Sequence, residues 1–262
     1  MANEENKTGS QEPDKSEFGE DRTQRCIALM DPEIREWLKL PLAKKVDKTR
    51  EIIKEAVAKY ERVGIGFSGG GDSEAMLHIA MQVKHDMPVL FVDTRYEFPE
   101  TIPFIEKIRS DWSIESLTTV RAASDKAEEF KKKYGFGTPE FTLEFNKYHK
   151  IEPLLKGIKN LKLDAFLGGI RGVEHEERAK EKVFSPRDNH VRVHPILFWT
   201  RDDVRTYLDN NKLPHNPLYD KGYTSLGSTL DTTPNKEGMH ERAGRGVARE
   251  RIMKKLRDLG YN

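Results

Sequence analysis

The sequence predicts an α/β fold with three layers, in which a mostly parallel, five-stranded sheet lies between helices on both faces. Unbroken apolar runs such as Pro88–Val92 and Ala165–Ile170 are typical of strands that are buried on both sides of a parallel sheet. Another run, Val63–Phe67, precedes a glycine turn and a helical pattern of apolar residues, the order in which such sheets are built. Ile114–Val120 and Val191–Ile196 complete the five predicted strands.

The composition narrows the classes of protein to which the chain belongs. Its 262 residues are 36% hydrophobic and 34% charged, and the net charge of +1 gives no general attraction to nucleic acids or membranes. No apolar run approaches the ~20 residues that a membrane helix needs, and the N-terminus shows no apolar signal region. The one cysteine, Cys26, excludes a disulfide framework or a cysteine metal site within the chain. We therefore expect a cytoplasmic protein without nucleic-acid or membrane partners.

The chain divides into four segments. Residues 1–24 are polar and acidic and predict a disordered tail, because they cannot bury enough apolar area to offset the entropy of ordering. Residues 25–60 carry helical patterns, and residues 61–200 hold the five predicted strands. Within this main domain, residues 134–150 are rich in glycine and aromatic residues and predict an irregular loop. Residues 201–262 form a helix, a loop and a basic tail that we expect to fold over the site.

The stretch Ser68–Ser73, which reads Ser-Gly-Gly-Gly-Asp-Ser, is the most specific chemical signal in the sequence. Its glycines allow the backbone to approach a ligand closely, and the first amides of the following helix favour an anion. No lysine follows the glycines, so this is not the phosphate loop of the common NTPases. We interpret the stretch as a phosphate-binding loop; the alternative is a glycine turn that only starts a helix. The predicted ligands of the phosphate are Ser68, Gly69, Gly70, Gly71, Asp72 and Ser73.

Polar residues and glycines also follow two of the predicted strands at their carboxyl ends, where open α/β sheets bind ligands. Asp93 and Thr94 follow the second strand, and Gly168 and Gly169 close the fourth. We expect these four residues to contact the nucleoside, its ribose or a magnesium ion. For Asp93 the alternative is a turn residue that caps the next helix.

Basic residues gather in two stretches that we expect to bind anions. Arg171 stands just past the fourth strand, where a guanidinium meets a phosphate or another oxyanion. Glutamates alternate with the bases that follow it, so a salt-bridged, solvated helix face is the alternative for those bases. His175 has no second histidine at ligand spacing, which predicts a surface histidine and not a metal ligand. The other predicted anion ligands are Arg178, Lys182, Arg187 and, in the basic tail, Arg242 and Arg245.

The loop resembles the pyrophosphate loop (S-G-G-x-D-S) of the adenine-nucleotide alpha-hydrolase superfamily, whose members hold ATP there and react at its α-phosphate. Four stretches in the right order together resemble the phosphoadenylylsulfate reductase domain family, over roughly residues 45–262. This resemblance implies an adenine-nucleotide alpha-hydrolase-like, Rossmann-like sheet. It also implies that residues 61–200 are the nucleotide-binding domain and that Ser68–Ser73 hold the pyrophosphate of ATP. The matching stretches are Ser68–Ser73, Val92–Glu100, Gly169–Arg171 with the Glu/Arg run after it, and His194–Gly227.

Members of this family differ in their chemistry. Reductases carry a C-terminal Glu-Cys-Gly motif, and iron–sulfur members add paired cysteines, often just after a Ser-(Ile/Leu)-Gly motif. Here Gly227 is followed by Ser228, so the resemblance implies no resident thiolate near the site and no iron–sulfur cluster. The small, nucleotide-binding subunit of heterodimeric ATP sulfurylase is similar in Arg178–Asp188 and in the tail Glu241–Tyr261, although an insert typical of that subunit is shortened here.

The resemblance therefore favours sulfate activation, in which ATP transfers its adenylyl group to sulfate and gives adenylyl sulfate and pyrophosphate. It implies ATP and Mg²⁺ as cofactors, a GTPase large subunit as partner, and catalysis by positioning and charge stabilisation. Three alternatives stay open: a sulfonucleotide-binding reductase or sulfotransferase homologue that uses an external thiol, adenylyl transfer to another acceptor such as flavin mononucleotide, and a nucleotide sensor without activity. The residues expected to be catalytic are Asp72, Arg171, Arg178 and Arg187, with Lys182, Arg242 and Arg245 in contact with sulfate.

Overall fold

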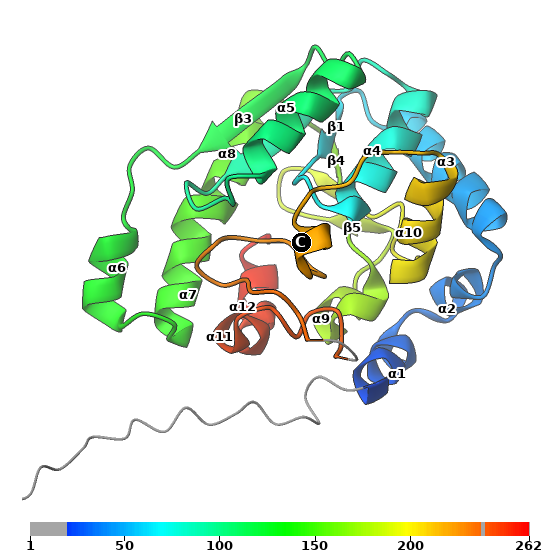
Figure 1. Ribbon diagram of the computed structural model, residues 1–262. Coiled ribbons are helices and arrows are strands. Elements are labelled where there is room, and N and C mark those ends of the chain that lie inside the picture. The colour runs from blue at the N-terminus through cyan, green and yellow to red at the C-terminus, as the bar shows by residue number, and fades with distance from the viewer. Residues whose placement is uncertain (1–19, 237–238, 262) are drawn as a thin grey trace, which may run out of the picture.

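The computed structural model of the chain describes residues 20–236 and 239–261. Its centre is a six-stranded sheet with the strand order β3–β2–β1–β4–β6–β5 (Figure 1). All neighbouring strands are parallel except β5, which runs antiparallel to β6. The strands are β1 (Val63–Gly66), β2 (Val89–Asp93), β3 (Leu117–Arg121), β4 (Ala165–Leu167), β5 (Phe184–Pro186) and β6 (Val191–Val193).

Helices cover both faces of this sheet, because successive residues of its buried strands point to opposite sides. Phe91 and Leu167 belong to the larger core, whereas Leu90 and Phe166 pack on the other face against Leu154. The helices over the larger core are α3 (Leu42–Lys59), α4 (Gly71–Val83), α5 (Thr101–Asp111) and α10 (Arg201–Asn210), and α8 (Glu152–Asn160) covers the opposite face (Figure 1).

The remaining helical elements frame the sheet. They are α1 (Glu20–Leu29), α2 (Pro32–Leu38), α6 (Ala127–Tyr134), α7 (Pro139–Asn146), the π-helical turn η2 (Lys147–Ile151), η3 (Gly172–Glu174), α9 (Glu176–Ala179), η4 (Tyr219–Lys221), α11 (Val247–Arg251) and α12 (Met253–Asp258). We call residues 239–261 the C-terminal arm. In Figure 1, α1 (blue) and the arm helices α11 and α12 (red) lie on the same, lower side of the sheet. No helix within residues 20–236 and 239–261 is both long and apolar enough to cross a membrane.

The predicted fold class is confirmed, with corrections at the edges. Phe184–Pro186 adds a sixth strand, which the sequence did not reveal because three residues are too few for a periodic signal. Residues 20–24 are the start of α1 and not the end of a disordered tail, and Arg22 is buried there. The rest of the predicted tail, residues 1–19, lies outside the described residues.

Residues 134–150, expected to be an irregular loop, are mostly helical. The Thr138 hydroxyl accepts a hydrogen bond from the Phe141 amide and caps α7, and Pro139 occupies its first turn. Phe141 and Phe145 are buried together with residues of α6. The aromatic residues of this segment therefore build a small core of their own.

Candidate functional site

A cavity of about 520 Å³ lies at the carboxyl ends of β1, β2 and β4. The loop Ser68–Ser73 lines one part of it, and Thr94 and Gly168 line it just past neighbouring strands. The C-terminal arm contributes arginines from another side. Because the carboxyl ends of parallel strands are where open α/β sheets bind ligands, this cavity is the candidate functional site.

The loop is held by its own hydroxyl groups and by one tyrosine. The Ser73 hydroxyl donates to the Gly70 carbonyl at 2.8 Å and accepts a hydrogen bond from the Ser68 amide at 3.1 Å. The Gly71 amide, at the start of α4, donates to the Tyr219 hydroxyl at 2.8 Å. Tyr219 therefore occupies one of the N-terminal amides that a helix offers to an anion.

Gly169 packs the end of β4 directly against this loop. A Cβ added there would lie 2.9 Å from the Ser73 Cα and 3.0 Å from its backbone nitrogen. We expect Gly169→Ala to destabilise the fold by about 1–3 kcal/mol and to weaken ligand binding, because the loop must shift to admit a methyl group. Urea unfolding measures the first effect, with Gly70→Ala, whose Cβ would meet only ordinary van der Waals contacts, as control. Wild-type stability of Gly169→Ala would contradict this account.

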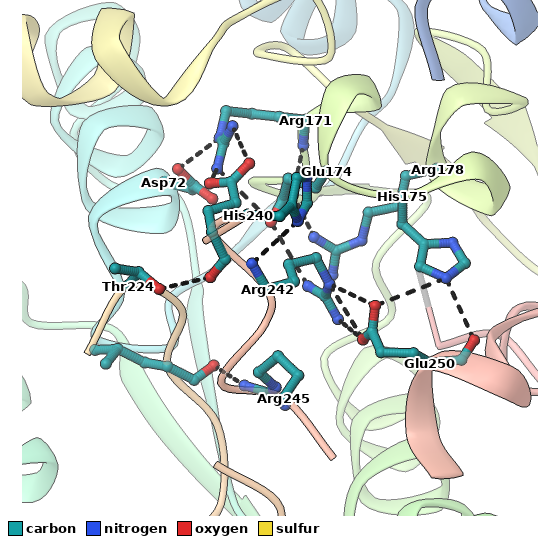
Figure 2. Close-up of polar contacts among 12 residues, drawn as sticks. Asp72, Arg171, Glu174, His175, Arg178, Thr224, His240, Arg242, Arg245 and Glu250 are labelled. Carbon is teal, nitrogen blue, oxygen red and sulfur yellow. Dashed lines mark hydrogen bonds and ion pairs between the residues drawn. The ribbon is translucent and has the colours of Figure 1, made fainter. Parts of the chain in front are cut away.

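Arg171 lies beside the loop, but its guanidinium is already paired with carboxylates. Nε donates to Asp72 Oδ1 at 2.8 Å (Figure 2), and the two Nη groups donate to the two oxygens of Glu241 at 3.2 and 2.6 Å. The Arg171 side chain is only 2% exposed. Glu241 belongs to the C-terminal arm, so this two-point pair joins the arm to the loop. An anion at the loop would therefore compete with Glu241 for this guanidinium.

The ion pairs continue from Arg171 into the arm as one buried network (Figure 2). Glu174 accepts a hydrogen bond from the Arg171 amide at 3.1 Å, pairs with Arg178, and lies 3.7 Å from Arg242. Arg242 in turn donates to Glu250 at 2.7 Å. Within the described chain, the network joins the arginines Arg22, Arg171, Arg178 and Arg242 to the carboxylates Asp72, Glu174, Glu241 and Glu250. This half of the site therefore carries balanced charge.

The other half of the site, which we call the basic end, has three basic side chains and two carboxylates, Asp231 beside the arginines and Glu97 near Lys150. It comprises Lys150, Arg245 and Arg249, all of which line the cavity. Among the residues that the structure describes, Asp231 is the carboxylate paired with the two arginines, at 3.5 and 2.5 Å. The Nε groups of both arginines are buried and make no hydrogen bond within the described chain. Because buried donors without partners are costly, the basic end is suited to an anionic ligand.

The pKa values agree with this division of the site. Burial, together with the charge of Arg249, lowers the pKa of Lys150 to about 7. Burial and the neighbouring Arg245 lower the pKa of Arg249 to about 10. In the balanced half, burial raises the pKa of Asp72 to about 6, although Arg171 opposes the rise. An anion bound at the basic end would return the pKa of Lys150 towards its ordinary value.

The cavity brings together most of the predicted site residues. Those that line it are Ser68, Gly70, Gly71, Asp72, Ser73, Thr94, Gly168, Gly169, Arg171, Arg178, Arg242 and Arg245. Gly69 instead faces Thr101 and Ile105, where its φ of +75° shapes the turn of the loop.

Besides Gly69, three predicted residues do not line the cavity: Asp93, Lys182 and Arg187. The carboxylate of Asp93 pairs with Arg121, and it accepts a hydrogen bond from a backbone amide two residues further on, which is a turn role. Arg187 donates to Glu181 at 3.2 Å, and Lys182 is exposed. The last two residues flank β5, which carries them to the edge strand of the sheet and away from the loop.

His175, predicted at the surface, is buried. Its Nδ1 accepts a hydrogen bond from the Glu177 amide at 3.0 Å and caps α9.

Glu241 and Arg249 were not predicted as site residues. The tail that carries them is basic, but no local pattern in it shows that it packs against the carboxyl ends of the strands. Lys150 was missed for another reason, because it enters the cavity from the π-helical turn η2, which has no sequence periodicity.

The described residues offer little support for a resident metal ion. Within residues 20–236 and 239–261, no three His, Cys, Asp or Glu side chains are grouped so that they could hold one. Asp72, a natural candidate for a magnesium ligand, is tied to Arg171. Mg²⁺ binding therefore stays a prediction.

The chain is similar to known proteins over most of its length. The model of the phosphoadenosine phosphosulfate reductase domain matches residues 62–234. The phosphoadenosine 5′-phosphosulfate reductase of Alkalilimnicola ehrlichii is 30% identical over 206 residues, which are 77% of this chain and 84% of that protein. The enzyme of the same name from Vibrio atlanticus is 31% identical over 206 residues, 76% of this chain and 79% of that protein.

Two solved structures resemble the fold at low sequence identity. Phosphoadenylyl-sulfate reductase from Candida auris, in a phosphate complex, has a TM-score of 0.59 and 24% identity, over 71% of this chain and 90% of that one. FMN adenylyltransferase from Candida glabrata, in complex with FAD and inorganic pyrophosphate, also has a TM-score of 0.59, with 19% identity over 82% of this chain and 73% of that one. These two similarities support the fold alone.

The relatives correct the functional expectation. They carry the name of the reductase and not that of the ATP sulfurylase small subunit, so adenylyl transfer from ATP to sulfate is contradicted and nucleotidyl transfer is not confirmed. Their enzyme names are those of sulfonucleotide reduction. The order of the sheet, the loop at its carboxyl edge and the match over residues 62–234 agree with one another, and the chain belongs to the phosphoadenosine phosphosulfate reductase domain family.

Proposed function

We propose that the chain binds a sulfonucleotide of the 3′-phosphoadenylyl sulfate type and presents its sulfonate to a thiol of another molecule. One observation carries the proposal: a single cavity combines a loop at a helix N-terminus with a separate basic end. A sulfonucleotide suits this arrangement, because its phosphosulfate and its 3′-phosphate are anionic groups held apart by a nucleoside. The reductase names of the relatives support the same class of substrate.

Sulfur chemistry of this kind needs a thiolate, which Cys26 does not supply. Cys26 is the one cysteine of the sequence, its side chain is fully buried in α1, and it does not line the cavity. Burial raises the pKa of its thiol to about 11, so it is protonated at neutral pH. The nucleophile of the proposed reaction therefore comes from a second molecule.

The proposed reaction consists of two displacements. First, the external thiolate attacks the sulfonate sulfur, the bond from that sulfur to the phosphate oxygen breaks, and adenosine 3′,5′-bisphosphate leaves with the electron pair. A second thiolate then attacks the thiol-derived sulfur of the S-sulfonate, so that sulfite leaves with the electron pair of the S–S bond and a disulfide remains. The two thiols are oxidised as the sulfonate is reduced to sulfite. Lys150, Arg245 and Arg249 would hold a phosphate of the adenosine 3′,5′-bisphosphate that leaves.

Calorimetric titration tests the proposal. We expect 3′-phosphoadenylyl sulfate and adenosine 3′,5′-bisphosphate to bind more tightly than ATP–Mg²⁺. Arg249→Gln should weaken their binding about tenfold or more, because a hydrogen bond to a charged group contributes ~1.5–3 kcal/mol. A preference for ATP–Mg²⁺ that survives Arg249→Gln would overturn the proposal and favour adenylyl transfer to an acceptor such as flavin mononucleotide.

Binding of the bisphosphate should also take up a proton at Lys150. The pKa of this amine is lowered to about 7 in the free chain, and a bound anion raises it, so affinity should fall as the pH rises above about 7. Calorimetry near pH 8, in two buffers with different ionisation enthalpies, measures the uptake. Lys150→Met should abolish it. Equal binding heats for the wild-type chain in the two buffers would contradict this prediction.

Cys26→Ala should leave the proposed reaction intact. With a small dithiol as reductant, we expect sulfite release from 3′-phosphoadenylyl sulfate to stay within about twofold of the wild-type rate, since a substitution away from the site acts through stability alone. Sulfite release and thermal unfolding are measured on the same preparation. Loss of release from a normally folded Cys26→Ala variant would place the nucleophile on this chain.

A further inference from the structure

We propose that α1 is a clamp for the site, in which Arg22 positions the C-terminal arm and with it Arg245 and Arg249 of the basic end. The inference rests on the proposed function only in taking the basic end as an anion-binding site. Both α1 and the arm lie outside residues 62–234, the part of the chain that the family model matches. The clamp is therefore an addition to the matched domain that acts on its cavity.

The contact between α1 and the arm is charged and buried. Arg22 Nη2 donates to Glu250 Oε2 at 2.7 Å, and both side chains are 6% exposed. The helix also packs against η3 and α9, the two turns that follow Arg171 in the chain. Arg22 therefore joins the arm to a part of the molecule that already carries the loop-side network.

Glu250 is the joint through which Arg22 acts. Its carboxylate also accepts a hydrogen bond from Arg242 at 2.7 Å, and His175 Nε2 lies 3.9 Å from it (Figure 2). Burial alone would raise the pKa of Glu250, but Arg242 and then Arg22 hold it well below its usual range, so the joint is ionised. This carboxylate therefore connects α1, the arm and α9 in one place.

The contacts of Glu250 matter because α11, the helix that carries it, is too short to be stable on its own. Helix α11 has five residues, so hydrogen bonds within it contribute little, and its place depends on side-chain contacts. Arg249 precedes Glu250 in this helix, lines the cavity, and donates to Asp231 at 2.5 Å. Any movement of Glu250 therefore moves Arg249. Loss of the Arg22 charge removes one of the two arginines on Glu250 and leaves Arg242, so we expect the arm to loosen while the domain stays folded.

The test compares Arg22→Gln with Arg25→Gln on the same helix, because Arg25 pairs with Glu176 at a site where both side chains are 41% exposed. Amide hydrogen exchange of residues 239–261 is measured without ligand, and affinity is measured with adenosine 3′,5′-bisphosphate. We expect Arg22→Gln to speed exchange in α11 and to weaken the affinity, each about tenfold, because a buried pair is broken. Exchange in α4 should not change. Arg25→Gln should alter each quantity by less than about twofold, and Arg22→Lys should recover part of the loss.

The outcomes separate this inference from the proposed function. Unchanged exchange in the arm of Arg22→Gln overturns the clamp, and so does faster exchange with unchanged affinity. If the wild-type chain does not bind the bisphosphate, the proposed function fails, while the exchange data still decide whether α1 holds the arm. If Arg22→Gln speeds exchange in α4 as well, the domain itself has opened, and Arg22→Lys becomes the deciding variant. Faster amide exchange of Arg22→Lys in the arm alone supports the clamp. Faster exchange throughout that variant overturns it.

Discussion

Replacing Glu241 by glutamine is expected to weaken the fold and to strengthen anion binding at the same time. The two carboxylate oxygens of Glu241 accept hydrogen bonds from both Nη groups of Arg171, whose side chain is 2% exposed. Without this carboxylate, the buried guanidinium keeps Asp72 as its close partner and loses its two-point pair. We expect a loss of about 3 kcal/mol in the free energy of unfolding, because removing one partner leaves a buried charge poorly compensated.

The same substitution should raise the affinity for inorganic pyrophosphate about tenfold or more. In the wild-type chain, we expect pyrophosphate to compete with Glu241 for Arg171, and each hydrogen bond to a charged group contributes ~1.5–3 kcal/mol. In Glu241→Gln this competition is removed, so saturating pyrophosphate should restore much of the lost stability. Calorimetry measures the affinity, and urea unfolding with and without pyrophosphate measures the stability.

The exposed ion pair between Arg25 and Glu176 provides a control for this prediction. Glu176→Gln removes the carboxylate of an arginine pair that is 41% exposed, and it should change neither quantity measurably. If Glu241→Gln binds pyrophosphate no better than the wild-type chain, Arg171 holds the arm and does not meet the ligand. The predicted anion-binding role of Arg171 would then be wrong.

The sequence predicted the parts of the fold whose signals are local. Buried parallel strands are short apolar runs, so the runs around Val63, Val89 and Ala165 indicated the central strands and the α/β class. The loop Ser68–Ser73 has a strand before it and a helix after it, and each of these can be recognised from neighbouring residues alone. For the same reason Thr94 and Arg171, which follow strand ends, were correctly expected at the cavity, although Asp93 was not.

What the sequence could not show depends on contacts between distant segments. Arg171 looks like a free cation in the sequence, but Glu241, 70 residues further on, pairs with it. Alternating charges around Arg187 fit both an anion site and a salt-bridged surface, and only its contact with Glu181 distinguishes them. Similarity of the tail to a sulfurylase subunit misled the functional prediction in the same way, because a basic tail does not specify what its arginines bind.

Glu74 is expected to make a large contribution to the pH dependence of stability. It lies in the first turn of α4, its side chain is fully buried, and its two carboxylate oxygens make no hydrogen bond within the described chain. Burial raises its pKa to about 8. The dipole of α4 favours a negative charge at this end by only ~0.3–1 kcal/mol, which is too little to offset the burial of an unpaired carboxylate. Glu74 is therefore a neutral acid at pH 7.

The stabilising contribution of this proton is lost in alkali. The carboxyl keeps its proton to higher pH in the folded chain than in the unfolded chain, where its ordinary pKa is 4.5. Its contribution to stability is therefore complete below pH 4.5 and is lost, by roughly 1.4 kcal/mol per pH unit, as the pH rises to about 8. Glu74→Gln does not titrate. It should match the wild-type chain within about 1 kcal/mol near pH 5 and exceed it by on the order of 4 kcal/mol near pH 9.

Urea unfolding of Glu74→Gln and of the wild-type chain across this pH range tests the prediction. The difference between their free energies of unfolding isolates Glu74, because the effects of all the other titrating groups cancel. Glu55→Gln, which changes an exposed carboxylate on α3, should follow the wild-type curve throughout. Parallel curves for Glu74→Gln and the wild-type chain would mean that the Glu74 carboxylate is ionised inside the fold. A negative charge would then lie two residues beyond Asp72 at the start of α4, and the loop would repel the anion that its amides otherwise attract.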